Sequence, residues 1–454
     1  MKRLHIQTHG CQINQRDSER IVQLMRQMDY VPTDRPEEAD LLLLNTCSVR
    51  DKAEQKVYSA LGRWRELKQK REGLIIGVGG CVAQQEGEDL LRRIPYLDLV
   101  FGTQNIHKLP GMVRQAESAG GRPLEIDFYR DSSYMEEPAA RTGIEGARAF
   151  VTIMQGCNKV CSFCVVPYVR GRELSRPGDN IVGEVQELVR RGVKEVMLLG
   201  QNVNSYGKTS PGELTFPGLL HRINGIEGLE RIRFTTSHPQ DLSAELIEAY
   251  ASLEKLCEHL HLPVQCGSDA VLRRMRRGYT LAGYRDRIRR LRDRCPDVAL
   301  STDIIVGFPG ESDGDFARTL EILEEVEYDD LYGFAYSPRP QTAAARFYPD
   351  DVPVEVKKER LDEVLRLQRE ISLKKNRKRI GLVEEILVEG LSKLKGNQIA
   401  GRTRDNRIVN AFGPDTLTGQ IIRVRITGAS ANSLLGEVAT ANGDLNGVEA
   451  RGTA

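Results

Sequence analysis

The sequence has neither an excess of charge of one sign nor a long apolar segment. Its 454 residues include 65 Lys and Arg and 64 Asp and Glu, which leaves a net charge of +1. A near-neutral chain has no general attraction for nucleic acid, so any contact with phosphate groups must come from local basic surface. The longest aliphatic run, residues 41–44, is too short to span a bilayer. The sequence also lacks internal repeats and low-complexity segments.

The first residues, MKRLHIQTHG, lack the apolar stretch of a signal peptide. We therefore expect a cytoplasmic protein with no membrane segment. The chain contains nine cysteines, and in a reducing cytosol cysteines cluster around metals more often than they form disulfides. Its length is that of two to four domains, each with its own core.

Three cysteines lie within eight residues of one another: Cys157, Cys161 and Cys164, the close set. A four-iron cluster needs four ligands, so three cysteines leave one iron free to bind something other than protein. An open position of this kind receives the substrate in catalytic metal sites. Zinc is an alternative, although no histidine stands near Cys164 as a fourth ligand, and a disulfide is less favoured because three thiols do not pair. The spacing therefore indicates an iron–sulfur cluster with a vacant iron.

The first hundred residues alternate apolar β-type runs with helical periodicity, as in a parallel sheet flanked by helices. The expected strands are residues 3–8, 40–45, 74–78 and 97–101. Cys11, Cys47 and Cys81, the strand-end set, each follow one of the first three strands. Ligands bind at the carboxyl ends of strands in open parallel sheets, so we expect these thiols to meet and to hold a second cluster. Three independent buried cysteines are the alternative.

The βα alternation resumes after a segment rich in Gly, Pro, Ser and charge, which is predicted to be a linker. The next expected strands are residues 149–154, 195–200, 231–236, 258–263, 299–306 and 330–336. Six βα units, with the close set after the first strand, predict a partial barrel that is open on one side. Reactive groups of such barrels lie on the loops that follow the strands.

Polar residues at these strand ends form a candidate site for a small, charged, nucleoside-like ligand. They are Gln201, Asn202, Ser237, His238, Gln265 and Gly307. Each alone is as readily an ordinary loop residue, and only the nearby cysteines favour a binding role. A basic run follows, for which a solvated helix face is the first interpretation and contact with phosphate the second. This run comprises Arg273, Arg274, Arg276 and Arg277.

The pattern changes after a helical stretch at residues 354–379. Strands expected at 383–388, 397–404, 421–427 and 433–438 predict a small β-barrel. Basic residues gather here and suit an RNA backbone, with a merely solvated basic surface as the alternative. The predicted RNA-binding residues are Lys374, Lys375, Arg377, Lys378, Arg379, Arg402, Arg404 and Arg407. The expected domain limits are 1–118, a linker at 119–142, 143–373, 374–440, and a tail at 441–454.

The motif GCNKVCSFC around the close set resembles the signature of radical S-adenosylmethionine (SAM) enzymes. The motifs THGCQ, NTCSVR and GCVAQ around the strand-end set resemble the three cysteine motifs of the methylthiotransferase amino-terminal domain, and the carboxyl-terminal barrel is similar to a TRAM domain, an RNA-binding module. Virtually the whole chain is thus similar to the methylthiotransferase family of radical SAM enzymes. This resemblance implies an α/β protein with a parallel-sheet domain, a partial (βα)6 radical SAM barrel and a TRAM β-barrel.

The segments VVPYVRGRELSRP, SHPQDL, HLPVQCGSD and TDIIVGFPGE are most similar to those of the family members that act on isopentenyladenosine in tRNA. Those enzymes convert N6-isopentenyladenosine at position 37 to its 2-methylthio derivative. Methylthiolation of threonylcarbamoyladenosine in tRNA or of a ribosomal protein aspartate, and a non-enzymatic iron–sulfur RNA-binding module, are the alternatives. Cys266 and residues 340–343 depart from the family pattern, in which we expect a serine and a Pro-Gly-Thr-Pro stretch.

The resemblance implies two [4Fe-4S] clusters and two SAM molecules per turnover. The close set would bind SAM through its free iron and start a 5′-deoxyadenosyl radical, because no side-chain base could deprotonate the inert C–H bond at adenine C2. The cluster of the strand-end set would present a sulfur that the other SAM methylates. The implied partners of this monomer are tRNA, an external electron donor, and sulfur or cluster delivery proteins. The implied SAM contacts are Phe163, Gln201, Asn202, Ser237, Gln265, Ile304 and Gly307.

Overall fold

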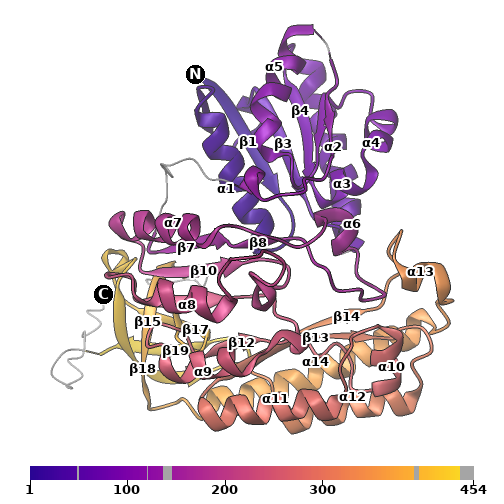
Figure 1. Ribbon diagram of the computed structural model, residues 1–454. Coiled ribbons are helices and arrows are strands. Elements are labelled where there is room, and N and C mark those ends of the chain that lie inside the picture. The colour runs from indigo at the N-terminus through magenta and orange to yellow at the C-terminus, as the bar shows by residue number, and fades with distance from the viewer. Residues whose placement is uncertain (49–50, 120, 136–145, 393–397, 440–454) are drawn as a thin grey trace, which may run out of the picture.

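The computed structural model describes residues 1–48, 51–119, 121–135, 146–392 and 398–439, which form three successive parts (Figure 1). An amino-terminal α/β domain precedes a six-stranded α/β core, and a β-barrel follows the core. Within these ranges, no helix is both long and apolar enough to cross a membrane.

The amino-terminal domain is a parallel sheet with the strand order β2-β1-β3-β4-β5-β6. Its strands are β1 (Lys2–Thr8), β2 (Tyr30–Pro32), β3 (Leu41–Thr46), β4 (Ile75–Gly80), β5 (Leu99–Phe101) and β6 (Leu124–Glu125). All residues of β3 and β4 are buried, because helices cover both faces of the sheet. One face packs against α1 (Gln12–Arg26) and α5 (Leu109–Ala119). The other packs against α2 (Asp51–Lys70), α3 (Cys81–Glu86) and α4 (Glu88–Arg93).

The amino-terminal sheet reaches into the segment predicted to be a linker at 119–142. Strand β6 pairs with β5, and the Arg122 guanidinium donates to the carbonyl oxygens of Leu91, Ile94 and Leu97 at 2.6–2.8 Å. Strands β2 and β6, with three and two residues, are too short to show an alternating pattern in the sequence. Residues 136–142 and the predicted tail at 441–454 lie outside the described residues.

The core contains the six predicted strands in two parallel sheets. One sheet has the order β11-β10-β7 and the other β12-β13-β14, and a bridge between Ile232 and Leu256 joins them. The strands are β7 (Arg148–Thr152), β10 (Glu195–Leu199), β11 (Arg231–Phe234), β12 (His259–His261), β13 (Ala299–Val306) and β14 (Asp330–Ala335). The helices are α6 (Val166–Arg170), α7 (Gly178–Arg190), α8 (Phe216–Asn224), α9 (Ala244–Ser252), α10 (Asp269–Arg274), α11 (Leu281–Arg294), α12 (Asp313–Val326), α13 (Ala343–Phe347) and α14 (Val354–Arg377). This arrangement confirms the partial barrel.

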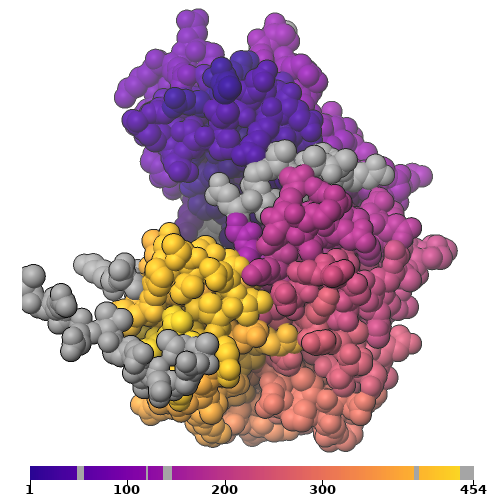
Figure 2. All heavy atoms as spheres, turned by 90° about the vertical axis from the view of Figure 1, so that its left-hand side faces the viewer, coloured from indigo at the N-terminus to yellow at the C-terminus, as the bar shows by residue number. Residues whose placement is uncertain are grey.

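The carboxyl-terminal part is a closed barrel with the strand order β15-β16-β17-β19-β18. Its strands are β15 (Val383–Leu391), β16 (Gln398–Thr403), β17 (Ile408–Phe412), β18 (Ile421–Ala429) and β19 (Leu434–Val438). Strand β17 was not predicted. Figure 2 shows this barrel, in yellow, lying against the core below the amino-terminal domain. The buried Arg233 of β11 fixes it there, by donating to the carbonyl oxygens of Thr403 (2.6 Å) and Arg404 (2.8 Å).

Candidate functional site

The close set lies in the loop between β8 (Met154–Gln155) and α6 (Val166–Arg170), after the first core strand as predicted. Strand β8 pairs with β9 (Leu174–Ser175), so the two ends of this segment are held together. Gly156 begins the loop with φ +82°, and a Cβ there would lie 1.9 Å from the carbonyl oxygen of Arg172. Ser162, inside the loop, donates from its hydroxyl to the carbonyl oxygen of Arg274 at 2.8 Å. The loop is therefore fixed at both its start and its middle.

The thiols of the close set influence one another and accept hydrogen bonds. Burial, together with the neighbouring Cys161, raises the pKa of Cys157 to about 11 and that of Cys164 to about 12. The backbone N–H of Lys159 donates to Cys157 Sγ at 3.4 Å, and the Arg277 guanidinium donates to Cys161 Sγ at 3.3 Å. Such donors orient cysteine ligands and tune a metal centre. A bound cluster would supply the positive charge that buried thiolates require.

Arg277 was interpreted as part of a solvated helix face, and the structure shows that this is wrong. Helix α10 ends at Arg274, so Arg277 lies beyond it. Its side chain is buried and also donates to the carbonyl oxygen of Pro263 at 3.0 Å. Arg273 and Arg276 are exposed, as that interpretation expected. Spacing in the sequence could not reveal where this helix would end.

The three thiols of the strand-end set come together at one edge of the sheet. Cys11 directly precedes α1, Cys47 follows β3, and Cys81 begins α3. A Cβ on Gly10 would lie 2.7 Å from Cys47 Cβ, so only glycine lets the first loop approach the second. The Cys11 and Cys81 thiols are near enough to repel as thiolates, although burial is the larger reason that the pKa of Cys81 is raised. Gly80 (φ +90°) supplies the turn before Cys81.

The described residues contain no group of three Cys, His, Asp or Glu side chains that could hold a single metal ion. Thiolates that share one zinc ion must each come within about 2.3 Å of it. Cysteines spread around a larger, multi-iron group are compatible with both sets.

Helix α6 connects the two sets. It begins directly after Cys164 and Val165, and Val165 and Val169 form an apolar cluster with Cys81. The Thr103 hydroxyl donates to the carbonyl oxygen of Val169 at 2.7 Å. The amino-terminal domain thereby binds the end of a helix that belongs to the core. The two cysteine sets are consequently neighbours, which the sequence did not indicate.

The polar residues at the strand ends divide into two kinds. Gln201 accepts from the backbone N–H of Gly156 at 2.5 Å, and Asn202 donates to Asp241 at 2.8 Å, so both side chains make hydrogen bonds within the protein. Ser237 Oγ and His238 Nε2, and also the Oδ1 atom of Asn202, are buried without a hydrogen-bond partner among the described residues. These three atoms are available for a ligand.

The other residues with an implied SAM contact lie nearby but differ in exposure. The half-buried Phe163 packs edge-on against Phe308, with ring centroids 6.5 Å apart. The backbone of Gln265 (φ +72°) exchanges hydrogen bonds with β13. Ile304 is fully buried. The Gly307 N–H donates to Glu311, and a Cβ on Gly307 would collide with Lys357.

His238 is a neutral donor in this environment. Burial, assisted by Arg277 and Lys159, lowers the pKa of His238 to about 2. Its Nδ1 accepts from the backbone N–H of Gln240 at 3.3 Å, so the proton of the neutral ring resides on Nε2. The sequence placed His238 at a strand end but gave no sign of this fixed tautomer.

Most of the predicted RNA-binding residues form ion pairs within the chain. The pairs are Lys374–Glu327, Lys375–Asp329, Arg379–Glu384, Arg379–Asp405, Arg402–Glu389, Arg404–Glu258, Arg407–Asp329 and Arg407–Asp405. Glu258, Glu327 and Asp329 are distant in sequence from the basic residues that they pair with, so composition alone suggested a free basic surface. Arg377 and Lys378 are exposed at the end of α14.

The departures from the family pattern lie in two places: Cys266 in the core, and residues 340–343 beside the loop of the close set, where the following Ala344 N–H donates to the carbonyl oxygen of Ser162 at 2.7 Å. Cys266 is fully buried in the core, with its Sγ 3.5 Å from Thr319 Oγ1. Thr342 caps α13 by accepting from the backbone N–H of Ala345. Cys257 and Cys295 are also buried free thiols.

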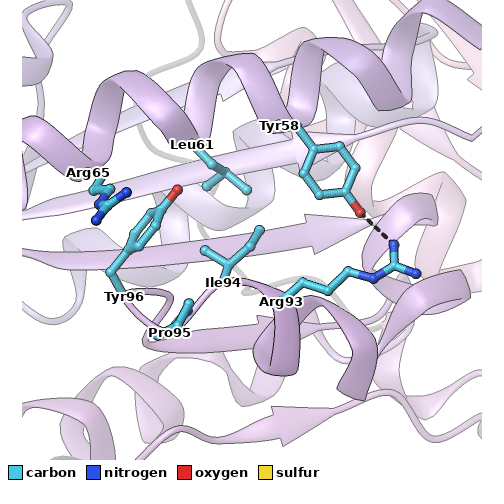
Figure 3. A pocket seen from close by; sticks show the side chains of 7 residues that line it. All are labelled: Tyr58, Leu61, Arg65, Arg93, Ile94, Pro95 and Tyr96. Atoms are coloured by element: carbon cyan, nitrogen blue, oxygen red, sulfur yellow. Dashed lines mark hydrogen bonds between the residues drawn. The ribbon is translucent and has the colours of Figure 1, made fainter.

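A surface hollow of about 670 Å³ lies on the amino-terminal domain, between α2 and the segment after α4 (Figure 3). Two tyrosines and two arginines line it, and Arg93 donates to the Tyr58 hydroxyl at 3.3 Å. Its lining includes neither cysteine set. We therefore do not place the candidate site there.

The fold and the close set define a radical SAM protein, and a model of the radical SAM superfamily matches residues 151–323. A model described as uncharacterized protein family UPF0004 matches residues 3–102, and a TRAM domain model matches residues 377–439. The chain belongs to the family of tRNA-2-methylthio-N(6)-dimethylallyladenosine synthases. The protein of that name from Geobacter sulfurreducens is 53% identical over 98% of this chain and 99% of its own. The protein of the same name from Aeromonas hydrophila is 48% identical over 98% of this chain and 93% of its own.

Solved structures share the fold at low identity. The radical SAM methyltransferase TsrM from Kitasatospora setae, with cobalamin and a [4Fe-4S] cluster bound, has a TM-score of 0.54 at 13% identity and covers 76% of this chain and 74% of its own. The cobalamin-dependent SAM radical enzyme OxsB has a TM-score of 0.52 at 12% identity, over 81% of this chain and 56% of its own. The chain's radical SAM class implies an iron–sulfur cluster and SAM as cofactors, and the thiols of the close set fit such a cluster.

Proposed function

We propose that this protein is a radical SAM methylthiotransferase that converts N6-isopentenyladenosine at position 37 of tRNA to its 2-methylthio derivative. The observation that carries the proposal is the position of α6 between the two cysteine sets. Replacing hydrogen by sulfur at one carbon requires a radical source and a sulfur source within reach of the same adenine. The relatives that match along almost the whole chain carry the name of this activity.

The close set would hold one [4Fe-4S] cluster with SAM, and the strand-end set would hold the second. When bound, these groups supply the radical that removes hydrogen and the sulfur that replaces it. The protein's own contribution is to orient them. Gln201 and Ser162 hold the close loop in place, and Arg277 donates to one of its sulfurs. Ser237 and His238 offer two buried donors to SAM at the adjoining strand end.

The proposed RNA substrate would be held partly by the barrel. Ion pairs and the buried Arg233 fix the barrel on the core, so the proposed RNA surface has a defined position relative to the cysteine sets. Arg377 and Lys378, exposed beside the barrel, are its first candidate contacts. The proposal also includes an external electron donor, delivery proteins for sulfur or clusters, a monomeric state and a cytoplasmic location.

The decisive experiment is anaerobic reconstitution with iron and sulfide, followed by incubation with tRNA, SAM and a reductant. Digestion of the tRNA should yield 2-methylthio-N6-isopentenyladenosine by mass spectrometry, together with 5′-deoxyadenosine. tRNA that lacks the isopentenyl group is the matched control and should yield no methylthio nucleoside. If SAM is cleaved but the expected nucleoside does not form, the substrate assignment is wrong. Methylthiolated threonylcarbamoyladenosine, or a modified ribosomal aspartate in a parallel assay, would then identify the alternative.

A further inference from the structure

Arg170 is a buried arginine at the end of α6, where the core meets the amino-terminal domain. Its side chain is only 4% exposed. The backbone there is fixed, because Gln104 donates from its side-chain amide to the Arg170 carbonyl oxygen at 3.0 Å. The guanidinium forms an ion pair with Asp17 of α1, with Nη2 and Oδ2 2.8 Å apart. Gly171, with φ +79°, ends the helix directly afterwards.

The guanidinium also lies against the strand-end set. The guanidinium is close enough to Cys81 and Cys11 for its charge to interact with both thiols. Val169, its neighbour, is in the apolar cluster that contains Cys81. Nη1 has no hydrogen-bond partner among the residues that the structure describes. The donors of a buried guanidinium are normally all hydrogen-bonded. The unpaired Nη1 is therefore available to donate to an acceptor at the strand-end set.

The charge of the second cluster explains why a cation is needed at this place. Three thiolates outweigh the charge of an oxidised four-iron, four-sulfide core, and a bound sulfur anion adds a further negative charge. Removing such a charge from water is costly unless an opposite charge or donor compensates it. Net charge and hydrogen bonds to sulfur also set the reduction potential of a cluster. Asp17 neutralises part of the charge of Arg170, so the pair together determines the field at the thiols.

We propose that Arg170 is a positioning residue of the strand-end set, which stabilises a small sulfur anion of the hydrosulfide or thiolate class at the vacant iron, and that Asp17 limits its effect. This inference rests on the proposed second cluster. Because α6 begins next to Cys164, Arg170 also holds the sulfur-bearing group at a fixed position relative to the close set. The length of five helical residues is about 7.5 Å.

The test uses the full-length chain with Cys157, Cys161 and Cys164 changed to Ala, so that only the second cluster contributes. Arg170→Met, Arg170→Lys, Asp17→Asn and the exposed control Arg172→Met are introduced into this background. The midpoint potential of the cluster is measured by an electron paramagnetic resonance titration. The affinity for hydrosulfide is measured by titrating sodium hydrosulfide against the cluster spectrum.

Arg170→Met should lower the midpoint potential and weaken hydrosulfide binding at least tenfold, because the cation is lost. Asp17→Asn should have the opposite effect on both quantities, because the guanidinium is no longer neutralised. Arg170→Lys should retain most of the wild-type behaviour, and Arg172→Met should retain all of it. Opposite shifts cannot result from a general loosening of the site, which would move both variants in the same direction.

Shifts of the same sign in Arg170→Met and Asp17→Asn, or no shift in either, would overturn the inference. If Arg170→Met does not retain a cluster, Asp17→Asn decides the matter: a raised midpoint potential with tighter hydrosulfide binding supports the inference, and no shift or the opposite shift overturns it. A background protein that binds no iron would instead refute the second cluster, and with it the proposed function. A background protein that binds iron but does not respond to Arg170 would refute this inference alone.

Discussion

Cys81 lies in one apolar cluster with Val165, the residue that follows Cys164. The last cysteine of one set thus packs in the same cluster as the chain neighbour of the last cysteine of the other. Two groups held at these positions would share one reaction space between the core and the amino-terminal domain. The contact depends on Thr103 and Gln104, which hold the backbone at the end of α6.

The two cysteine sets should have separable functions. We expect about eight irons per chain from two four-iron clusters. Changing the close set to Ala should leave about four irons and abolish SAM cleavage. Changing the strand-end set to Ala should also leave about four irons, but SAM cleavage should continue while methylthiolation stops. Iron analysis and 5′-deoxyadenosine assays check this, and cleavage that survives loss of the close set would contradict it.

Arg277 should support the close loop. Arg277→Met removes the donors to Cys161 Sγ and to the Pro263 carbonyl oxygen. A hydrogen bond that involves a charged group contributes about 1.5–3 kcal/mol, so we expect SAM cleavage to slow by at least about tenfold. The control is Arg273→Met, whose side chain is exposed. Equal rates for the two variants would show that Arg277 is not needed at the loop.

Arg233 should stabilise the junction between core and barrel. It pairs with Glu195 at 2.9 Å, and both side chains are only 1% exposed. Arg233→Met leaves the buried carboxylate of Glu195 with less positive charge beside it. Breaking a buried ion pair of this kind costs about 3–5 kcal/mol. The free energy of unfolding, measured with denaturant on the apo protein, should fall by that amount. Arg222→Met is the control, because its pair with Asp179 is solvent-exposed and should contribute no more than about 1 kcal/mol.

His238 should make stability depend on pH. Its pKa is about 2 in the folded protein, against an ordinary value of 6.5, so below pH 6.5 the unfolded chain binds a proton that the folded chain does not. The free energy of unfolding of the wild type should therefore fall by about 2 kcal/mol as the pH drops from 7 to 5, because of His238. His238→Gln should show a smaller fall in denaturant titrations at the two pH values. The exposed His221→Gln variant should follow the wild type, and parallel curves for His238→Gln would contradict the assigned shift.

Arg377 and Lys378 should contribute to tRNA binding. Changing each to Ala should weaken binding to all tRNAs alike and lower the slope of log affinity against log salt by about one per lost phosphate contact. Filter binding at several salt concentrations measures this. Arg366→Ala is the control on the same helix, because Arg366 pairs with Glu370. An unchanged slope in the double variant would place the RNA surface elsewhere.

Much of the fold could be predicted because buried strands carry their pattern locally. The apolar runs at residues 41–44 and 74–78 identified central strands, and the position of each cysteine after a strand predicted the strand-end set. Short edge strands such as β6 carry no such pattern. The basic residues near the barrel were interpreted as RNA-binding because positive charge is concentrated there. The structure pairs Arg404 with Glu258 and Arg407 with Asp329, and these partners could not be foreseen because they are far away in sequence.

The sequence by itself determined the two cysteine sets, the three-part organisation and the family, because these depend on residue identity, spacing and order along the chain. Only the tertiary structure decided that α6 brings the sets together, that Arg277 turns inward to a sulfur, and that Arg170 is buried beside Cys81 and Asp17. These contacts join segments up to about 150 residues apart, and they form only when the core folds and packs against the amino-terminal domain. Burial and the partner of a charged side chain are properties of that packing, so the sequence pattern does not contain them.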